Sequence, residues 1–281
     1  MDIVSVLSSD IRQKKELKGI AESIIKKELN SYFSKNKQVF SLLNSYSNEK
    51  QLRKSSDYRK IIKKIRQKFH ESYGMFQIPE NADEIKKEFL KKVKMNSAGE
   101  EDYNSILSTH LSTKERIQNY QAIYQKIFRI TGKPKVILDL GCGINPLSWY
   151  YMPVKNFKYI ASDIDIASLN FIGQYFDLAG INSETLVLDL QNKDDLEKLS
   201  AIQCDVCFLF KVLEIDKRIA EPIFNSIKAK FIVASFSTLS ITGKIMKNSE
   251  RLWFEKMLSR LHLSFETFRT ENEIFYIVRK G

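Results

Sequence analysis

The feature that most constrains the fold is a series of short apolar segments that begins at residue 135. They span 135–140, 158–164, 184–190, 204–210, 230–236, 264–269 and 273–279. The first five are separated by stretches long enough for crossover helices, which predicts parallel strands with helices on both faces of one sheet. The last two are joined only by residues 270–272, the length of a hairpin loop. The chain is therefore predicted to be an α/β protein with a seven-stranded sheet.

This strand order resembles the Rossmann-like fold of S-adenosylmethionine (SAM)-dependent methyltransferases, and the turn after the first strand tests the resemblance. The stretch 138–151 reads LDLGCGINPLSWYY. A dinucleotide-binding loop would have a third glycine where Pro146 stands, so that reading is disfavoured. The methyltransferase pattern is formed here by Asp139, Gly141, Gly143 and Asn145. Glycine lets the backbone approach a ligand closely, so we expect this turn to bind the amino-acid end of SAM. Asn145 is expected to be the N-cap of the next helix and Pro146 its first residue.

Two further acids follow the second and third predicted strands. Asp163 ends the second strand, where a carboxylate can accept both ribose hydroxyls. Asp189 ends the third, where it can accept a hydrogen bond from the adenine amino group. Ligands of open α/β sheets bind at the carboxyl ends of strands. A lone acid there is often only a helix cap, but Asp139, Asp163 and Asp189 beside a glycine turn together favour a cofactor site.

Residues 1–104 have a different pattern and are predicted to form a helical domain, followed by a methyltransferase domain at 105–281. Apolar residues in the first part recur at steps of three and four, as they do on one face of a helix. Helices are expected at 21–33, 61–76, 81–95 and, opening the second domain, 106–128, with 96–104 as a polar linker.

The charge of the N-terminal part indicates a polyanionic partner. The chain has a net charge of +11, and the run 50–68 holds nine basic residues against Asp57 alone. Such a run is either a solvated helix face or a set of phosphate contacts. The second interpretation predicts RNA-binding residues at Arg59, Lys60, Lys63, Lys64, Arg66 and Lys68.

Several classes of protein are disfavoured. No stretch approaches the roughly 20 apolar residues that span a membrane, and MDIVSVLSSD at the start lacks the regions of a signal peptide. A cytoplasmic protein without a membrane partner is expected. The cysteines are Cys142, Cys204 and Cys207, and the last two form a C-x-x-C on a predicted strand. Residues three apart on a strand point to opposite faces, and no second ligand pair accompanies them, so we expect buried thiols and no metal site.

Further segments resemble one family. They are HLSTKER (110–116), GCGINPLSWY (141–150), the acids within 163–165, FLFKVL (208–213), SFSTLSITGK (235–244), LWFE (252–255), NEIFYI (272–277) and KIRQKFHESYGMF (64–76). Over most of its length the chain is similar to the aminoglycoside-resistance 16S rRNA (guanine-1405 N7) methyltransferases of the Arm/Rmt and FmrO type. The resemblance implies SAM as the cofactor and 16S rRNA in the 30S subunit as the partner. It also implies methylation at guanine N7, and with it aminoglycoside resistance.

The resemblance assigns roles to the matched positions. Arg116 would pair with the SAM carboxylate, and Gly141 would line the methionine end. Asp163 would hold the ribose and Asp189 the adenine. His110 is expected to be a packed or capping residue rather than a general base.

Two departures from the family fall where the target base would approach. Ser237 stands in place of a family proline, and the segment 245–253 is shortened and altered. They leave the methyl-transfer chemistry in place, while the identity of the target nucleotide stays open.

The sequence also indicates how the methyl transfer would proceed. Guanine N7 carries a lone pair and no proton, so no general base is needed, and the sequence has neither an N-P-P-Y/F motif nor a cysteine suited to C5 chemistry. Catalysis would rest on alignment and electrostatics, with Lys211 contacting the RNA or the target base. Lys244 and Trp253 are predicted RNA contacts. Trp253 and Phe254 either stack on a flipped guanine or belong to the core.

Two other functions are compatible with parts of the sequence. A SAM-dependent methyltransferase acting on another RNA nucleotide, a small molecule or a protein would explain the glycine turn. A small-molecule or protein substrate would leave the basic helical domain unexplained. A non-catalytic RNA-binding protein would explain the basic run, but not the intact turn with its three acids.

Overall fold

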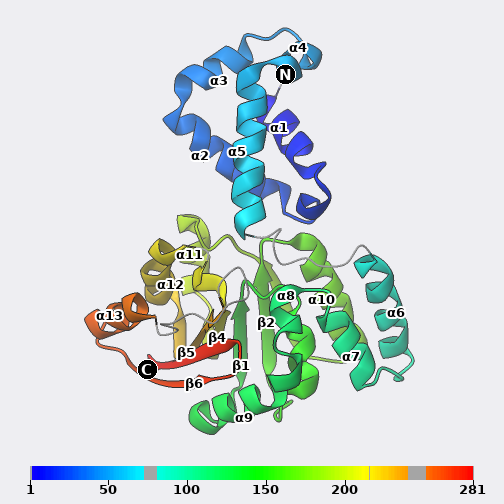
Figure 1. The fold of residues 1–281 in the computed structure, drawn as a ribbon, viewed down its shortest axis with the longest axis vertical. Helices are drawn as coiled ribbons and strands as arrows, with labels where there is room; N and C mark the ends of the chain where they lie inside the picture. The colour runs from blue at the N-terminus through cyan, green and yellow to red at the C-terminus, as the bar shows by residue number, and fades with distance from the viewer. Residues whose placement is uncertain (1, 73–80, 215, 240–250, 281) are drawn as a thin grey trace. The chain divides into compact units, whose positions relative to one another are not determined.

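The computed structural model describes residues 2–72, 81–214, 216–239 and 251–280. These residues contain one seven-stranded sheet of order β3-β2-β1-β4-β5-β7-β6, which confirms the predicted fold class (Figure 1). The first five strands pair in parallel, β7 is antiparallel to β5, and β6 is antiparallel to β7. The strands are β1 (Val136–Leu140), β2 (Lys158–Asp163), β3 (Ser183–Val187), β4 (Gln203–Phe210), β5 (Lys228–Ser237), β6 (Ser264–Arg269) and β7 (Glu273–Arg279).

Each face of the sheet has its own apolar core. Successive side chains of a strand point to opposite faces, so Ile137 belongs to one buried cluster and Leu138 to the other. The first cluster includes residues of α9 (Tyr120–Thr131) and α10 (Ile166–Leu178), and the second includes residues of α12 (Ala220–Ser226) and α13 (Leu252–Arg260). The helices that follow the strands are α10 (Ile166–Leu178), α11 (Lys193–Ser200), α12 (Ala220–Ser226) and α13 (Leu252–Arg260). Between β1 and β4 the strand order reverses direction, which is where open α/β sheets hold their ligands.

The region before β1 differs from the prediction of one helix at 106–128. The structure has α7 (Glu100–Leu107), α8 (Leu111–Lys114), a 3-10 turn (Ile117–Asn119) and α9 (Tyr120–Thr131). His110 has an extended backbone, with φ −132° and ψ 130°, and this interrupts the helical path. The predicted linker 96–104 is also too long, because α7 already begins at Glu100.

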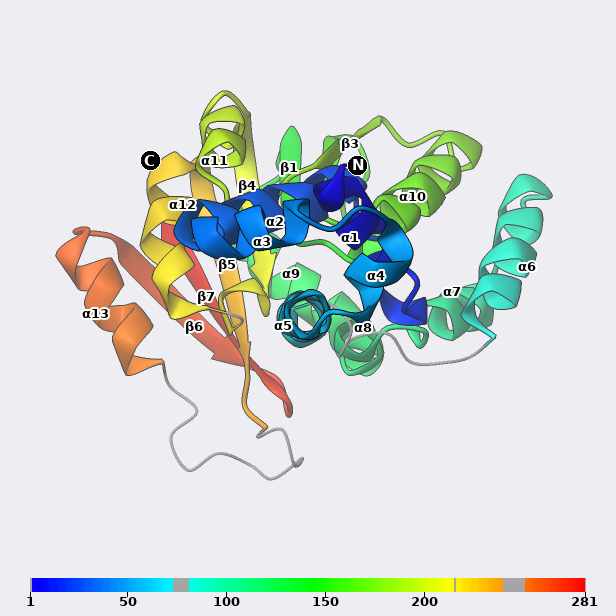
Figure 2. The same ribbon diagram turned by 90° about the horizontal axis from the view of Figure 1, so that it is seen from above.

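The helices of the N-terminal part pack around a core of their own. They are α1 (Ile3–Arg12), a 3-10 turn (Lys15–Leu17), α2 (Glu22–Lys35), α3 (Lys37–Asn44), α4 (Glu49–Lys54) and α5 (Ser56–Ser72). Helix α5, seen end-on in Figure 2, buries Ile61, Ile65 and Phe69 at steps of four residues. This apolar stripe faces the other helices, and the lysines and arginines occupy the rest of its surface.

The contacts divide the chain into two compact units. The first is Met1–Gln77 with Ile164–Ala167, and the second is Ile78–Asp163 with Ser168–Gly281. The boundary expected at 104/105 lies inside the second unit, because α6 (Ala82–Lys94) packs on α7 with the rings of Phe89 and Tyr103 5.1 Å apart. Within the part of the chain that the structure describes, no helix is long and apolar enough to cross a membrane.

Candidate active site

The turn after β1 requires glycine at two positions. Gly141 has φ +61° and Gly143 has φ +51°, a region that other residues rarely adopt. A Cβ atom on Gly141 would lie 2.8 Å from Cγ2 of Val212, and one on Gly143 would lie 3.3 Å from Nε2 of His110. The predicted turn is therefore present, and it is closely packed on its protein side.

Buried polar groups support this turn from below. Asp139 accepts hydrogen bonds from Asn145 Nδ2 at 2.8 Å and from Tyr159 Oη at 2.7 Å. Asn145 Oδ1 in turn accepts from Tyr120 Oη at 3.0 Å. Burial raises the pKa of Asp139 to about 6. The expected N-cap role of Asn145 is wrong, since it is the first residue of a 3-10 helix (Asn145–Tyr151) and its side chain is buried.

The two other acids lie at the same edge of the sheet but differ in setting. Asp163 ends β2, is 8% exposed, and accepts the Gly143 N–H at 2.8 Å, so it joins the second strand to the turn. Asp189 does not end β3, which stops at Val187. It lies in the following loop, where its Oδ1 accepts the Gln191 N–H at 2.9 Å.

Arg116 is held by an acid that the sequence reasoning missed. Its Nε and Nη2 donate to the two carboxylate oxygens of Glu273, each at 2.8 Å, and both side chains are 2% exposed. The guanidinium also lies over the Phe210 ring, 4.9 Å from its centroid. Burial disfavours the charge on Arg116, but Glu273 outweighs this and raises its pKa. The available signal was Glu273 itself, an acid opening an otherwise apolar strand.

Lys211 is in an unusual conformation just after β4. It has φ +61°, and its N–H donates to the carbonyl and hydroxyl oxygens of Ser235, both at 3.1 Å. Its Nζ pairs with Glu115, which the sequence reasoning also missed. A non-glycine residue in this region costs about 1–3 kcal/mol and often marks a functional site.

His110 and the cysteines are packed side chains. Burial, followed by the nearby charges of Arg116, Lys86 and Lys211, lowers the pKa of His110 to about 3, so its imidazole is neutral at physiological pH. Cys204 and Cys207 are buried, and burial raises both thiol pKa values, that of Cys204 to about 12. Among the described residues no group of three or more His, Cys, Asp or Glu side chains could hold a metal ion.

The side on which the target base is expected is only partly described. Phe254 is fully buried, so of the two alternatives left by the sequence it belongs to the core. Trp253 is partly buried, edge-on to Phe236 at 5.8 Å, with Lys217 Nζ 5.7 Å from its ring. Lys244 lies outside the described residues.

Ser237 makes a contact that the proline of the resembling family cannot make. Its N–H donates to Oε1 of Glu214 at 2.6 Å, and proline has no N–H. Nη2 of Arg251 donates to the same Glu214 oxygen at 3.2 Å and to the Ser237 carbonyl at 2.8 Å. The residues on the two sides of 240–250 are thus joined through Glu214.

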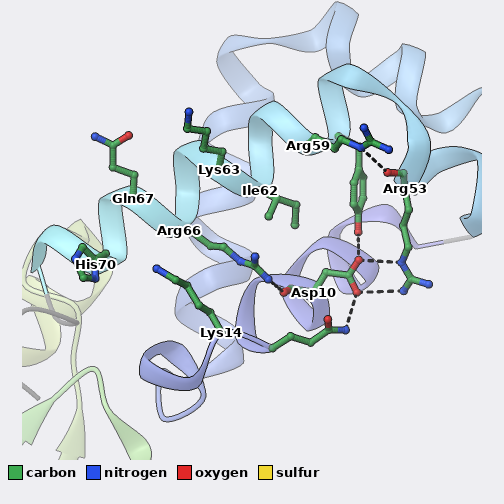
Figure 3. A pocket seen from close by; sticks show the side chains of 11 residues that line it. Asp10, Lys14, Arg53, Arg59, Ile62, Lys63, Arg66, Gln67 and His70 are labelled. Atoms are coloured by element: carbon green, nitrogen blue, oxygen red, sulfur yellow. Dashed lines mark hydrogen bonds and ion pairs between the residues drawn. The ribbon is translucent and has the colours of Figure 1, made fainter. Parts of the chain in front are cut away.

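Helix α5 presents the predicted RNA-binding residues in two groups. Arg59, Lys63 and Arg66 line a cavity of about 670 Å³ in the first unit (Figure 3). The other three interact within the unit: Lys60 with Asp57 at 3.7 Å, Lys64 over the Tyr32 ring at 4.9 Å, and Lys68 with Glu28 at 2.7 Å. Asp57 and Glu28 offset part of the charge that Lys60 and Lys68 offer to an external anion, whereas the neutral Tyr32 ring leaves the charge of Lys64 in place.

Asp10 organises the inner wall of this cavity. Its carboxylate accepts from Arg53 Nε at 2.8 Å and from Tyr58 Oη at 2.6 Å, and its carbonyl accepts from Arg66 Nη2 (Figure 3). In the part of the chain that the structure describes, Nε of Arg66 is buried without a hydrogen-bond partner. The remaining lining residues are Gln13, Lys14, Ile62, Gln67 and His70. Over the whole lining, lysines and arginines therefore outnumber the acid Asp10.

Comparison with known families decides the class of protein. The family described as "Ribosomal RNA methyltransferase (FmrO)" matches residues 46–277. The chain belongs to the FmrO family of ribosomal RNA methyltransferases. The resemblance drawn from the HLSTKER segment and the glycine turn is thereby confirmed, and the protein is a methyltransferase of ribosomal RNA.

Curated relatives in the FmrO family are similar over most of their length. The "16S rRNA (guanine(1405)-N(7))-methyltransferase" of Micromonospora rosea is 28% identical over 236 residues, covering 80% of this chain and 84% of the relative. The protein of the same name from Proteus mirabilis is 26% identical over 242 residues, covering 79% and 85%.

Solved structures show the same fold. The 16S rRNA methyltransferase RmtF, in complex with S-adenosyl-L-homocysteine, aligns with a TM-score of 0.72 at 18% identity, covering 100% of this chain and 99% of its own. The 16S rRNA methylase ArmA aligns with a TM-score of 0.56 at 26% identity, covering 70% and 98%.

Proposed function

We propose that this FmrO-family protein transfers a methyl group from SAM to N7 of guanine 1405 of 16S rRNA in the 30S subunit, and so confers aminoglycoside resistance. The observation that carries the proposal is the glycine turn joined to Asp163 at the carboxyl edge of the sheet. Two features support the target: the names of the curated relatives and the basic face of α5.

The residues at this edge fit SAM. A carboxylate offers about four acceptor sites, so Asp163 can accept ribose hydroxyls while it keeps the Gly143 N–H. Asp189 is partly exposed and can accept the adenine amino group. Gly141 and Gly143 let the backbone approach the methionine end, and Arg116 can meet its carboxylate with the N–H groups that Glu273 leaves over.

The proposed reaction needs alignment rather than a base. When bound, SAM would supply an electrophilic methyl group on its sulfonium. The N7 lone pair of guanine would form the new C–N bond as the S–CH3 bond breaks, with that electron pair left on the sulfur of S-adenosylhomocysteine, and no proton is lost. A neutral, packed His110 is consistent with this. We assign Lys211 to contact with the RNA or the target base, held in place by Glu115 and by its strained backbone. Asn145 contributes by holding the turn, since its side chain is bonded to Asp139 and Tyr120.

Docking on the rRNA is assigned to the first unit. Lysine and arginine bind phosphates without sequence preference and position a protein on a nucleic acid. Arg59, Lys63 and Arg66 are the foremost candidates because they line the cavity, and Lys60, Lys64 and Lys68 would add weaker contacts. Trp253 and Lys244 would contact RNA near the target base.

A second target is favoured by one observation. Glu214 accepts from the Ser237 N–H and from Arg251, and so links the residues on the two sides of 240–250, and a proline at 237 would remove the first of these bonds. The same methyl transfer could therefore be directed to another nucleotide of the rRNA.

The test is methylation of defined substrates. Labelled SAM, at a concentration near its Kd for the wild-type protein, is given with purified 30S subunits, naked 16S rRNA or free nucleotides, and Asp163→Ala serves as the low-activity control. N7-methylguanine weakens the glycosidic bond, so borohydride and aniline should cleave the strand at position 1405. Label on an adenine, or robust transfer without such cleavage, would contradict the N7 assignment; cleavage at another guanine would identify the second target.

A further inference from the structure

The segment Ile164–Ala167 links β2 to α10, yet by its contacts it belongs to the first unit. It directly follows Asp163. It forms a short antiparallel bridge with residues 19–21: the Ala21 N–H donates to the Ile164 carbonyl at 3.1 Å, and the Ile166 N–H donates to the Gly19 carbonyl at 3.0 Å. Hydrogen bonds within the first unit therefore fix the residues that directly follow the acid assigned to the ribose.

This bridge is tightly packed. Ile20 is fully buried, Asp165 is 2% exposed, and Ile164 packs against the apolar core of the first unit. A Cβ atom on Gly19 would lie only 2.0 Å from Oδ1 of Asp165. That oxygen also accepts the Ala167 N–H at 3.1 Å, which limits how far the carboxylate can turn away. The segment is thus fixed on its side of Asp163.

Asp163 is fixed on its other side by strand and turn. Its Oδ2 accepts the Gly143 N–H at 2.8 Å, and its carbonyl accepts the Leu188 N–H at 3.2 Å. The position of the carboxylate therefore depends on the sheet and, through one peptide bond, on the bridge to residues 19–21. A displacement of that bridge changes the backbone angles next to Asp163.

We propose that the first unit is a positioning element for the cofactor, acting through its hold on Ile164–Ala167. The inference rests on the proposed role of Asp163 in binding the SAM ribose. Binding free energies are reciprocal, so RNA docking that steadies this unit raises the affinity for SAM, and SAM steadies the bridge. Gly19 and Asp165 are positioning residues in this account, since neither has to touch the cofactor.

Two kinds of change in the first unit should differ in their effect on SAM binding. Charge reversal on α5 removes RNA contacts and leaves the bridge intact, so it should spare SAM binding. A change at Gly19 removes no charge and should weaken SAM binding. If the two units were independent, neither change would alter the affinity for SAM.

The test compares Gly19→Ala with Gly99→Ala, where an added Cβ meets no atom within 4 Å. Calorimetry should give a SAM affinity about tenfold weaker for Gly19→Ala, within the usual range of coupling between sites, and a wild-type affinity for Gly99→Ala. Adding Asp165→Ala to Gly19→Ala removes the clashing carboxylate and should restore part of the loss. Circular dichroism verifies that each variant is folded.

A folded Gly19→Ala variant with wild-type SAM affinity would overturn the inference. If Gly19→Ala does not fold, hydrogen exchange on the wild-type chain decides. S-Adenosylhomocysteine should slow exchange at the Ala21 and Ile166 amides, and unchanged exchange there would equally overturn it. A wild-type chain that does not bind SAM would overturn the proposed function itself, so the two failures are distinguishable.

Discussion

The carboxyl edge of the sheet and the basic face of α5 present charged groups in opposite ways. At the sheet edge Asp163 and Arg116 are at least nine-tenths buried, and each is held by hydrogen bonds. On α5, Lys60 is largely exposed, with a partner one helical turn away. Buried groups act through exact placement and lose their effect when one partner is removed. Exposed cations act through summed charge, which salt weakens.

Removing Arg116 should have the largest effect. Arg116→Ala leaves Glu273 buried without its partner, which costs about 3–5 kcal/mol of stability, and it should abolish resistance to aminoglycosides in a susceptible host. Denaturant unfolding and inhibitory concentrations measure the two effects. The double variant Arg116→Ala/Glu273→Ala should regain stability but not resistance. If it regained both, Arg116 would be structural only.

Charge reversal on α5 tests the opposite kind of site. Arg59→Glu, Lys63→Glu and Arg66→Glu together should weaken 30S binding on the order of a hundredfold at physiological salt and flatten the salt dependence, if each contacts one phosphate. SAM affinity measured by calorimetry should not change. Reversal of Lys60, Lys64 and Lys68, which do not line the cavity, is the matched control and should do less. Equal effects would remove the distinction between the two groups of cations.

Asp163→Ala should weaken SAM binding by about 1.5–3 kcal/mol, the usual loss for hydrogen bonds to a charged acceptor. Calorimetry measures it, and 30S binding at saturating cofactor is the control that should hold. Asp189→Ala should lose less, since Asp189 is more exposed and adenine offers it one amino group. Unchanged SAM affinity in folded Asp163→Ala would place the ribose elsewhere.

The pH dependence of stability distinguishes two ionisable groups at the sheet edge, His110 and Asp139. The pKa of His110 is lowered to about 3 from 6.5, so the unfolded chain binds this proton first and stability is lost as pH falls below about 6.5. The pKa of Asp139 is raised to about 6 from 3.8, so its contribution is lost as pH rises from about 4 through 6. His110→Gln should therefore remove the His110 contribution to the slope below pH 6.5, at most about 1.4 kcal/mol per pH unit, so that the opposite contribution of Asp139 between about pH 4 and 6 is no longer offset. Unfolding curves at several pH values measure this, and an unchanged slope would contradict the assignment.

The smallest effect is expected at Ser237. Ser237→Pro removes the N–H that Glu214 accepts, at a cost of about 0.5–1.5 kcal/mol, whereas Ser237→Ala keeps it. Thermal unfolding measures the cost, and mapping of the methylated base shows whether the contact directs target choice. An identical product from both variants would leave Ser237 with a structural role alone.

Much of the fold could be predicted from local patterns. Short apolar runs marked all seven strands to within a few residues, because strands covered on both faces of a sheet bury successive side chains and so form nearly continuous apolar segments. The prediction failed at 106–128, where helical periodicity continues through His110 although the chain there is extended. Phe254 was ambiguous for a related reason, since an aromatic residue on a helix looks the same in sequence whether it faces the core or a ligand.

What the sequence determined by itself is the succession of strands along the chain, the glycine turn and the acids beside it, because these depend on neighbours within a few residues. Tertiary structure alone decided the partners. Arg116 and Glu273 are 157 positions apart and meet only because β7 inserts beside β5. Likewise Ile20 pairs with Asp165, although more than half of the chain separates the two residues in sequence. Contacts of this kind arise when distant surfaces are buried together, and no periodicity or spacing along the chain encodes which charge will meet which.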